Sequence, residues 1–134
     1  MTMSVFDISG RAMSAQLVRL NTTASNMANA GTVAGSAEEA YRTRKPVFAA
    51  AFDRSSDARA TVDVEKIVTA GAEPVKRHDP GHPLADADGY IYEAAVDTQA
   101  EMVDMLEASR NFQNNVEVLR TAKSLMLSTL KLGG

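Results

Sequence analysis

Cysteine and tryptophan are absent from the 134-residue sequence, and its aromatic residues are limited to four phenylalanines and three tyrosines. Without cysteine the chain can form no disulfide, no thiolate zinc site and no cysteine nucleophile. Aromatic side chains normally supply the largest buried areas, so their scarcity argues against a large hydrophobic core. We therefore expect one domain, or one small domain with extensions.

Strongly basic segments and long apolar runs are also lacking. The net charge of −3 offers no basic surface for nucleic acid, and no apolar run approaches the roughly 18 residues of a membrane span. The N-terminus lacks the basic start of a secretory signal peptide. The acid-free stretch 8–37 resembles an organelle transit peptide only superficially, because transit peptides lack the packing pattern described next. We expect neither nucleic-acid binding nor direct membrane insertion.

The N-terminal segment carries a helical pattern from Val5 to Ala30. Apolar or small residues recur there at alternating spacings of four and three, which is the heptad pattern of a coiled-coil helix roughly 40 Å long. The positions of this predicted seam are Phe6, Gly10, Met13, Leu17, Leu20, Ala24 and Met27.

The C-terminal segment repeats the pattern without glycine or proline between Asp97 and Lys131. This predicts a second helix roughly 50 Å long that packs against the first. An alternative reading is a pair of ordinary amphipathic helices in a small bundle. The predicted seam comprises Met102, Met105, Ser109, Phe112, Val116, Leu119, Lys123, Met126 and Leu130.

The middle of the chain is a different kind of sequence and contains all four prolines. Alternating or β-branched residues predict short strands at Pro46–Phe52, Val62–Val68 and Gly89–Glu93. The predicted fold class is thus α+β, with two long terminal helices forming a coiled coil and a small β-rich domain between them. The expected boundaries are 1–30 for the first helix, 31–95 for a flexible connector and outer domain, and 96–134 for the second helix.

Small, neutral, hydrogen-bonding residues occupy the first helix outside its seam. Solvated helix faces usually carry Lys and Glu, so this composition favours close packing against further protein; a weakly polar solvent face is the alternative. The residues are Ser14, Gln16, Asn21, Thr22, Thr23, Ser25, Asn26 and Asn29, and the run Asn111, Gln113, Asn114 and Asn115 has the same character in the second helix.

No catalytic, cofactor or metal constellation emerges from the sequence. The pair His78 and His82 lies among prolines that break any helix able to align two ligands. Phosphate-binding loops, nucleophile elbows and calcium loops are missing. The start of the second helix carries an acidic stripe, whose negative charge is favoured there by the helix dipole. The stripe consists of Asp97, Glu101, Asp104 and Glu107. We also hypothesise that this stripe meets Arg11 or Arg19 of a neighbouring subunit.

Two motifs at the chain ends resemble those of the bacterial flagellar axial proteins. The first is Ser25-Asn26-Met27-Ala28-Asn29 at the end of the N-terminal helix. The second runs from Val96-Asp97 through Glu101-Met102-Val103 and 108–115 to 123–126. The longer connector and the segment 80–90 make the chain similar to the proximal members of the basal-body rod protein family. The sequence departs from the family in having Ala94-Ala95 where Pro-Asn is usual.

This resemblance implies a non-enzymatic subunit that polymerises helically into a drive shaft crossing the periplasm and transmitting torque. It implies partners among other copies, other rod proteins, the MS-ring or rod-base adaptor proteins and the type III export apparatus, with export lacking signal cleavage. Terminal helices would form the inner layer, and the middle segment the outer domain. The motif residues expected at subunit interfaces are Asn21, Asn26, Asn29, Glu101, Arg110, Gln113 and Asn115.

Two other functions remain open at this point. A soluble helical adaptor would bind one partner helix in a one-to-one complex, and a small hydrolase would depend on His78 and His82. The rod hypothesis further predicts termini that are mobile in the isolated chain and ordered only when neighbours cover them.

Overall fold

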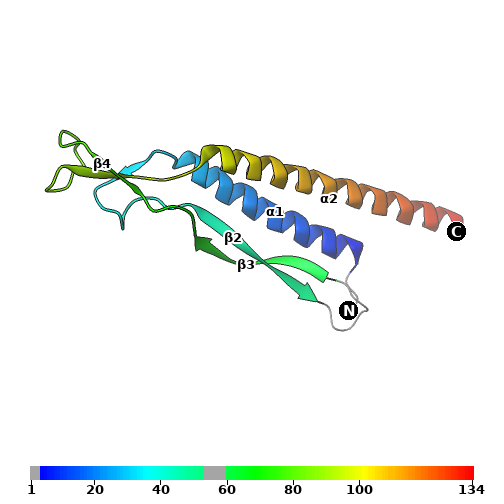
Figure 1. The fold of residues 1–134 in the computed structure, drawn as a ribbon. Helices are drawn as coiled ribbons and strands as arrows, with labels where there is room; N and C mark the ends of the chain where they lie inside the picture. The colour runs from blue at the N-terminus through cyan, green and yellow to red at the C-terminus, as the bar shows by residue number, and fades with distance from the viewer. Residues whose placement is uncertain (1–3, 53–59) are drawn as a thin grey trace.

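The computed structural model describes residues 4–52 and 60–134. Two helices, α1 (Val5–Ala28) and α2 (Thr98–Leu132), lie side by side and antiparallel (Figure 1). Both helices were predicted within about two residues at each end. The middle of the chain forms β-structure, as predicted, so the fold is α+β.

Each helix begins at a residue that satisfies its free backbone N–H groups. The hydroxyl of Ser4 accepts a hydrogen bond from the Asp7 N–H at 3.2 Å, and the Asp7 carboxylate accepts one from the Ser4 N–H at 3.0 Å. This reciprocal capping box fixes the start of α1. The carboxylate of Asp97 accepts bonds from the N–H groups of Gln99 and Ala100, both at 3.1 Å, and starts α2.

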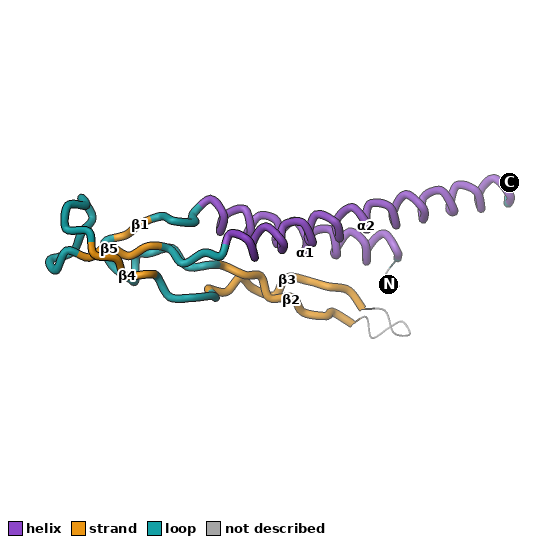
Figure 2. The backbone as a smooth tube through the Cα atoms, turned by 45° about the horizontal axis from the view of Figure 1, so that its top comes forward, coloured by secondary structure: helices purple, strands orange, loops and turns teal. Residues whose placement is uncertain are grey.

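The described residues of the middle segment form two antiparallel sheets. Strands β2 (Arg44–Phe52) and β3 (Ala60–Thr69) form a long hairpin that runs beside α1 (Figures 1 and 2). A small sheet with the order β1-β5-β4 lies beyond the ends of both helices, and its strands are β1 (Val33–Ala34), β5 (Tyr90–Glu93) and β4 (Val75–His78). The expected connector therefore contains a paired strand, and β1 and β4 are strands that the sequence analysis missed.

The buried stripe of α2 differs from the predicted seam. Its buried positions are Glu101 and Ala108, and its half-buried positions are Asp104, Met105, Ser109, Asn111, Phe112, Asn115, Val116, Leu119 and Ala122. The predicted seam residues Met105, Ser109, Phe112, Val116 and Leu119 are thus half-buried, and the stripe also includes Ala108 and Asn115, one residue before two of them. The predicted seam residues Met102 and Met126 are instead 52% and 53% exposed. At the first turn of α2 the buried position is Glu101, which hydrogen-bonds to Asn26, and Met126 lies where α2 extends past the start of α1.

The predicted seam of α1 is also not confirmed as one continuous stripe. Phe6 and Leu17 are exposed, whereas Met13, Leu20 and Met27 are half-buried. The most buried residues of α1 are small or hydrogen-bonding, because this helix packs against α2 on one side and the β2–β3 hairpin on another. They are Ser9, Ala15, Thr22, Thr23 and Asn26.

Candidate functional site

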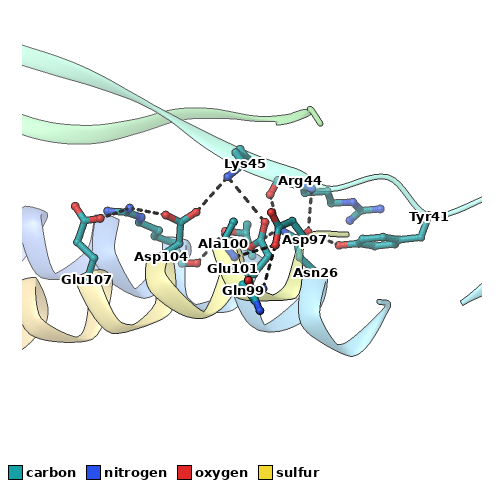
Figure 3. A network of polar contacts seen from close by, with 12 residues as sticks. Asn26, Tyr41, Arg44, Lys45, Asp97, Gln99, Ala100, Glu101, Asp104 and Glu107 are labelled. Atoms are coloured by element: carbon teal, nitrogen blue, oxygen red, sulfur yellow. Dashed lines mark hydrogen bonds and ion pairs between the residues drawn. The ribbon is translucent and has the colours of Figure 1, made fainter. Parts of the chain in front are cut away.

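A buried polar network joins the end of α1, the start of α2 and the first residues of β2 (Figure 3). At its centre lies Asn26, of which only 1% is exposed. Its Nδ2 donates to the backbone carbonyl of Arg44 at 2.8 Å and to Oε2 of Glu101 at 3.0 Å. Its Oδ1 accepts from the Tyr41 hydroxyl at 2.6 Å and from the Arg44 N–H at 2.9 Å. The amide thus uses all four of its hydrogen-bonding positions.

The side chain of Asn26 completes the backbone pairing of β2. The Ala70 N–H donates to the Thr43 carbonyl at 2.8 Å, at the open end of the hairpin. In an antiparallel ladder the next residue, Arg44, directs its N–H and C=O away from the partner strand. Both groups bond to Asn26, which acts like a short third strand and attaches the hairpin to α1.

Glu101 is the acidic member of this network and is 3% exposed. A buried carboxylate is costly unless it is paired and hydrogen-bonded. Oε2 accepts from Asn26, and Oε1 lies 3.9 Å from the ammonium of Lys45. Its position in the first turn of α2 adds a favourable interaction with the helix dipole.

The acidic stripe finds its cations within the same chain. Arg19 lies 3.4 Å from the carboxylate of Asp104 and 3.2 Å from that of Glu107, while Lys45 lies 3.1 Å from Asp104. Arg11, the other residue hypothesised to meet the stripe, pairs with Asp63 of the hairpin at 3.0 Å. The cations hypothesised to come from a neighbouring subunit thus already have carboxylate partners within their own chain.

The remaining motif residues fall into two groups. Asn29 caps α1, with its Nδ2 donating to the Ser25 carbonyl at 2.8 Å. Asn115 is half-buried and donates to the Asn111 carbonyl at 2.9 Å. Together with Asn26 and Glu101, these two residues serve the chain's own fold. The exposed members of the predicted interface set are Asn21, Arg110 and Gln113.

The free end of α2 is unusually apolar for an exposed surface. Helix α2 continues past the start of α1 (Figure 2), and Val5 at that start lines an open groove of about 500 Å³ together with Val118 and Leu125. Met126 and Leu130 lie on the predicted seam, where burial was expected, whereas the other residues of this surface lie off that seam. Its large exposed side chains are Leu125, Met126, Leu127, Leu130 and Leu132.

A second exposed apolar surface lies near the start of α2. Val103 is 62% exposed and Leu106 is 66% exposed, and Met102 adjoins them. Monomeric proteins rarely expose contiguous apolar surface of this kind unless it serves an interaction. Both ends of α2 therefore present surfaces suited to contact with other protein chains.

Two carboxyl groups within residues 4–52 and 60–134 have lowered pKa values, and hydrogen bonds to local backbone explain both. Hydrogen bonds from the backbone N–H and hydroxyl of Ser4 hold the pKa of Asp7 below its ordinary value. Bonds from the N–H groups of Tyr90 and Asp88 do the same for the pKa of Asp86. Both carboxylates stabilise local backbone, Asp7 at a helix start and Asp86 at a turn.

His78 at the end of β4 and His82 in the loop before β5 both have structural partners. The ring of His78 packs edge-on against Tyr90, with centroids 4.9 Å apart, and Nδ1 of His82 accepts from the Leu84 N–H at 3.0 Å. Across residues 4–52 and 60–134, no three His, Asp or Glu side chains gather as a metal site would require. In the same part of the chain, no helix has the length and apolar character needed to cross a membrane.

Comparisons with known proteins match both helical ends and nearly the whole chain. The family model described as "Flagella basal body rod protein" matches residues 6–35, and "Flagellar basal body rod FlgEFG protein C-terminal" matches residues 87–132. The flagellar basal-body rod protein FlgC of Yersinia enterocolitica is 47% identical over 131 residues, which cover 98% of this chain and 97% of the relative. FlgC of Salmonella typhimurium is 44% identical over 132 residues, covering 98% and 97%. FlgC of Agrobacterium fabrum is 32% identical over 126 residues, covering 93% and 90%.

Proposed function

The chain belongs to the flagellar basal-body rod protein family, and on that premise we propose that it is a proximal-rod subunit whose exposed apolar helix surfaces are covered by neighbouring subunits. It is a structural subunit of the basal-body rod and not an enzyme. We propose in addition that copies of this chain stack helically, together with other rod proteins, into the shaft that transmits torque.

The free end of α2 is the observation that carries this proposal. Helix α2 has 35 residues and α1 has 24, so α2 extends beyond its partner by about 16 Å at 1.5 Å per residue. An isolated helix end of this length is marginal in water without tertiary packing. Its exposed leucines, together with Leu106 and Val103 near the other end of α2, give each subunit apolar surface for its neighbours.

The helical segments and the middle segment are expected to have different places in the rod. We propose that segments 1–30 and 96–134 form the inner, helical layer of the rod and that 31–95 forms the outer part. Exposed Asn21, Arg110 and Gln113 are the motif residues available for contacts between subunits. The further partners are proposed to be rod-base adaptor proteins of the MS ring and the type III export apparatus, with a periplasmic location reached without signal cleavage.

Complementation of a strain lacking the gene tests the function. We expect the double variant Leu127→Glu/Leu130→Glu to be made at normal levels and to keep the helical content of the parent, yet to assemble no rod and restore no motility. The reason is that two carboxylates would be buried without partners at the contact between subunits.

The matched control places the same charges on comparably exposed apolar residues of the middle segment, Val75→Glu/Leu84→Glu. Motility with this control and none with the α2 variant would support the proposal. Normal rods and motility with the α2 variant would refute it. Isolation of a stable one-to-one complex with no polymer would instead favour the helical adaptor.

A further inference from the structure

The buried stripe of α2 repeats every seven residues, which creates a problem of register. Glu101, Ala108, Asn115 and Ala122 are each seven residues apart and all are buried or half-buried. The larger residues between them repeat at the same interval. A partner helix facing such a repeat can slide by one heptad, about 10.5 Å, and meet similar apolar contacts again.

Polar residues of α2 distinguish the first heptad of the stripe, 101–107, from the next, 108–114. The acidic triplet, Glu101, Asp104 and Glu107, receives every contact that α2 makes with Asn26, Lys45 and Arg19 in the polar network. One heptad further along, the corresponding residues are Ala108, Asn111 and Asn114. None of these three carries a charge, and alanine has no acceptor for an amide.

We propose that the acidic triplet sets the register of α2 along α1. In the slipped register Asn26 would keep a donor with no acceptor, and both cations would lose their carboxylates. Buried polar groups without partners are costly, and fixing register is the best-attested role of buried polar pairs in helix packing. The triplet thus selects one of several registers that the weak apolar stripe would tolerate.

A second device could set the register instead. Strands β1 and β5 pair Val33 with Glu93, and the Ala94 N–H donates to the Thr32 carbonyl at 2.9 Å, only four residues before α2 begins. If this pairing alone sets the register, changes in the triplet would lower stability without moving α2. The two explanations therefore differ in a distance that can be measured in the isolated chain.

The consequence for assembly depends on the proposed function, whereas the register itself does not. A slip of one heptad changes the length of the free end of α2 by about 10.5 Å. That end is the surface proposed to meet the neighbouring subunit. A chain in the wrong register would fold its helices and still fail to fit the rod.

Spin labels on introduced cysteines report the register cleanly because the chain has no cysteine of its own. Since Asn26 faces Glu101 and the helices are antiparallel, position 14 lies level with position 113. Labels at Ser14→Cys and Leu106→Cys, or at Ser14→Cys and Arg120→Cys, are then each offset along the axis by seven residues, about 10.5 Å. All three positions are exposed.

Two variants move the register in the proposed account. Glu101→Ala/Asp104→Asn/Glu107→Asn makes the first heptad resemble the second, and we expect a second population of distances beside the parental one. Adding Ala108→Glu/Asn111→Asp/Asn114→Glu moves the triplet by one heptad. In that variant we expect the 14–120 distance to shorten and the 14–106 distance to lengthen, each by up to about 10 Å.

The control Glu38→Gln/Glu39→Gln/Glu65→Gln removes three carboxylates outside the helix pair and should leave both distances unchanged. The variant with the moved triplet decides the matter, because it keeps every charge and should fold in the slipped register. Parental distances in that variant, or loss of its helix content, would overturn the proposal. Parental distances would assign the register to the β1–β5 pairing instead.

Discussion

Replacing Asn26 with alanine removes the centre of the polar network and should destabilise the chain severely. Four hydrogen bonds of 2.6–3.0 Å are lost. The Tyr41 hydroxyl keeps a neighbour, because Ser25 Oγ lies 3.3 Å away. The N–H and C=O of Arg44 and the buried carboxylate of Glu101 each lose a partner, at about 1–3 kcal/mol per buried group.

These three losses sum to about 3–5 kcal/mol, taking the lower part of that range for the partly buried backbone groups. Alanine returns only about 0.5 kcal/mol through its better helix propensity. Small domains have total stabilities of about 5–15 kcal/mol, so the loss is a large share of what holds the chain together. Urea denaturation followed by helical circular dichroism measures it directly.

The matched control is Asn21→Ala, which makes the same substitution at an exposed position five residues earlier in α1. We expect the control to be neutral or slightly stabilising. Asn26→Asp sharpens the test, since it preserves the shape and the acceptor atom while turning the donor into an oxygen that faces Glu101 and the Arg44 carbonyl. Unfolding free energies for Asn26→Ala within 1 kcal/mol of the control would refute the reasoning.

Three further predictions concern single sites. Tyr41→Phe removes the hydroxyl that donates to Asn26 and should cost about 1 kcal/mol in urea denaturation; an unchanged midpoint would contradict this. Gly89→Ala should lower stability by about 1–2 kcal/mol, because φ is +80° and the new Cβ would lie 3.1 Å from Cγ of Pro80; calorimetry measures the change. Hydrogen bonds from the N-cap residue lower the pKa of Asp7 below its ordinary value of 3.8. The ionised Asp7 carboxylate therefore contributes its full share to the free energy of unfolding above pH 3.8. This contribution is lost as the pH falls through the lower pKa of Asp7 in the folded state. Amide exchange in the first turn of α1 should show this loss, and Asp7→Asn should abolish the pH dependence.

The sequence predicts the helices well and the buried stripe of α2 only in part. Gly- and Pro-free heptad patterns define α1 and α2, and Met105, Phe112 and Leu119 are correctly placed in the stripe. Ser109 and Val116 are half-buried as well, whereas Met102 and Met126 are wrong, because the reasoning assumed that apolar residues are buried. Here Glu101 and Ala108 are buried and Met102 is exposed, which reverses that assumption.

The polar network shows a second limit of sequence reasoning. The amide-rich face of α1 was expected to pack against further protein, whereas Thr22, Thr23 and Asn26 are buried within their own chain. Spacing within a helix cannot reveal that the backbone of Arg44 needs a partner. Strands β1 and β4 were missed for a related reason, since they are short and are defined by their pairing with β5 rather than by alternation.

The central claim is that this rod subunit is completed by its neighbours. Hydrogen exchange of the backbone amides at 121–132, compared between the isolated chain and purified basal bodies, tests it most directly. The account predicts fast exchange in the isolated chain and strong protection in the assembled rod, because the exposed leucines of α2 become buried there. Equally fast exchange in both samples, or full protection in the dilute monomer, would contradict it.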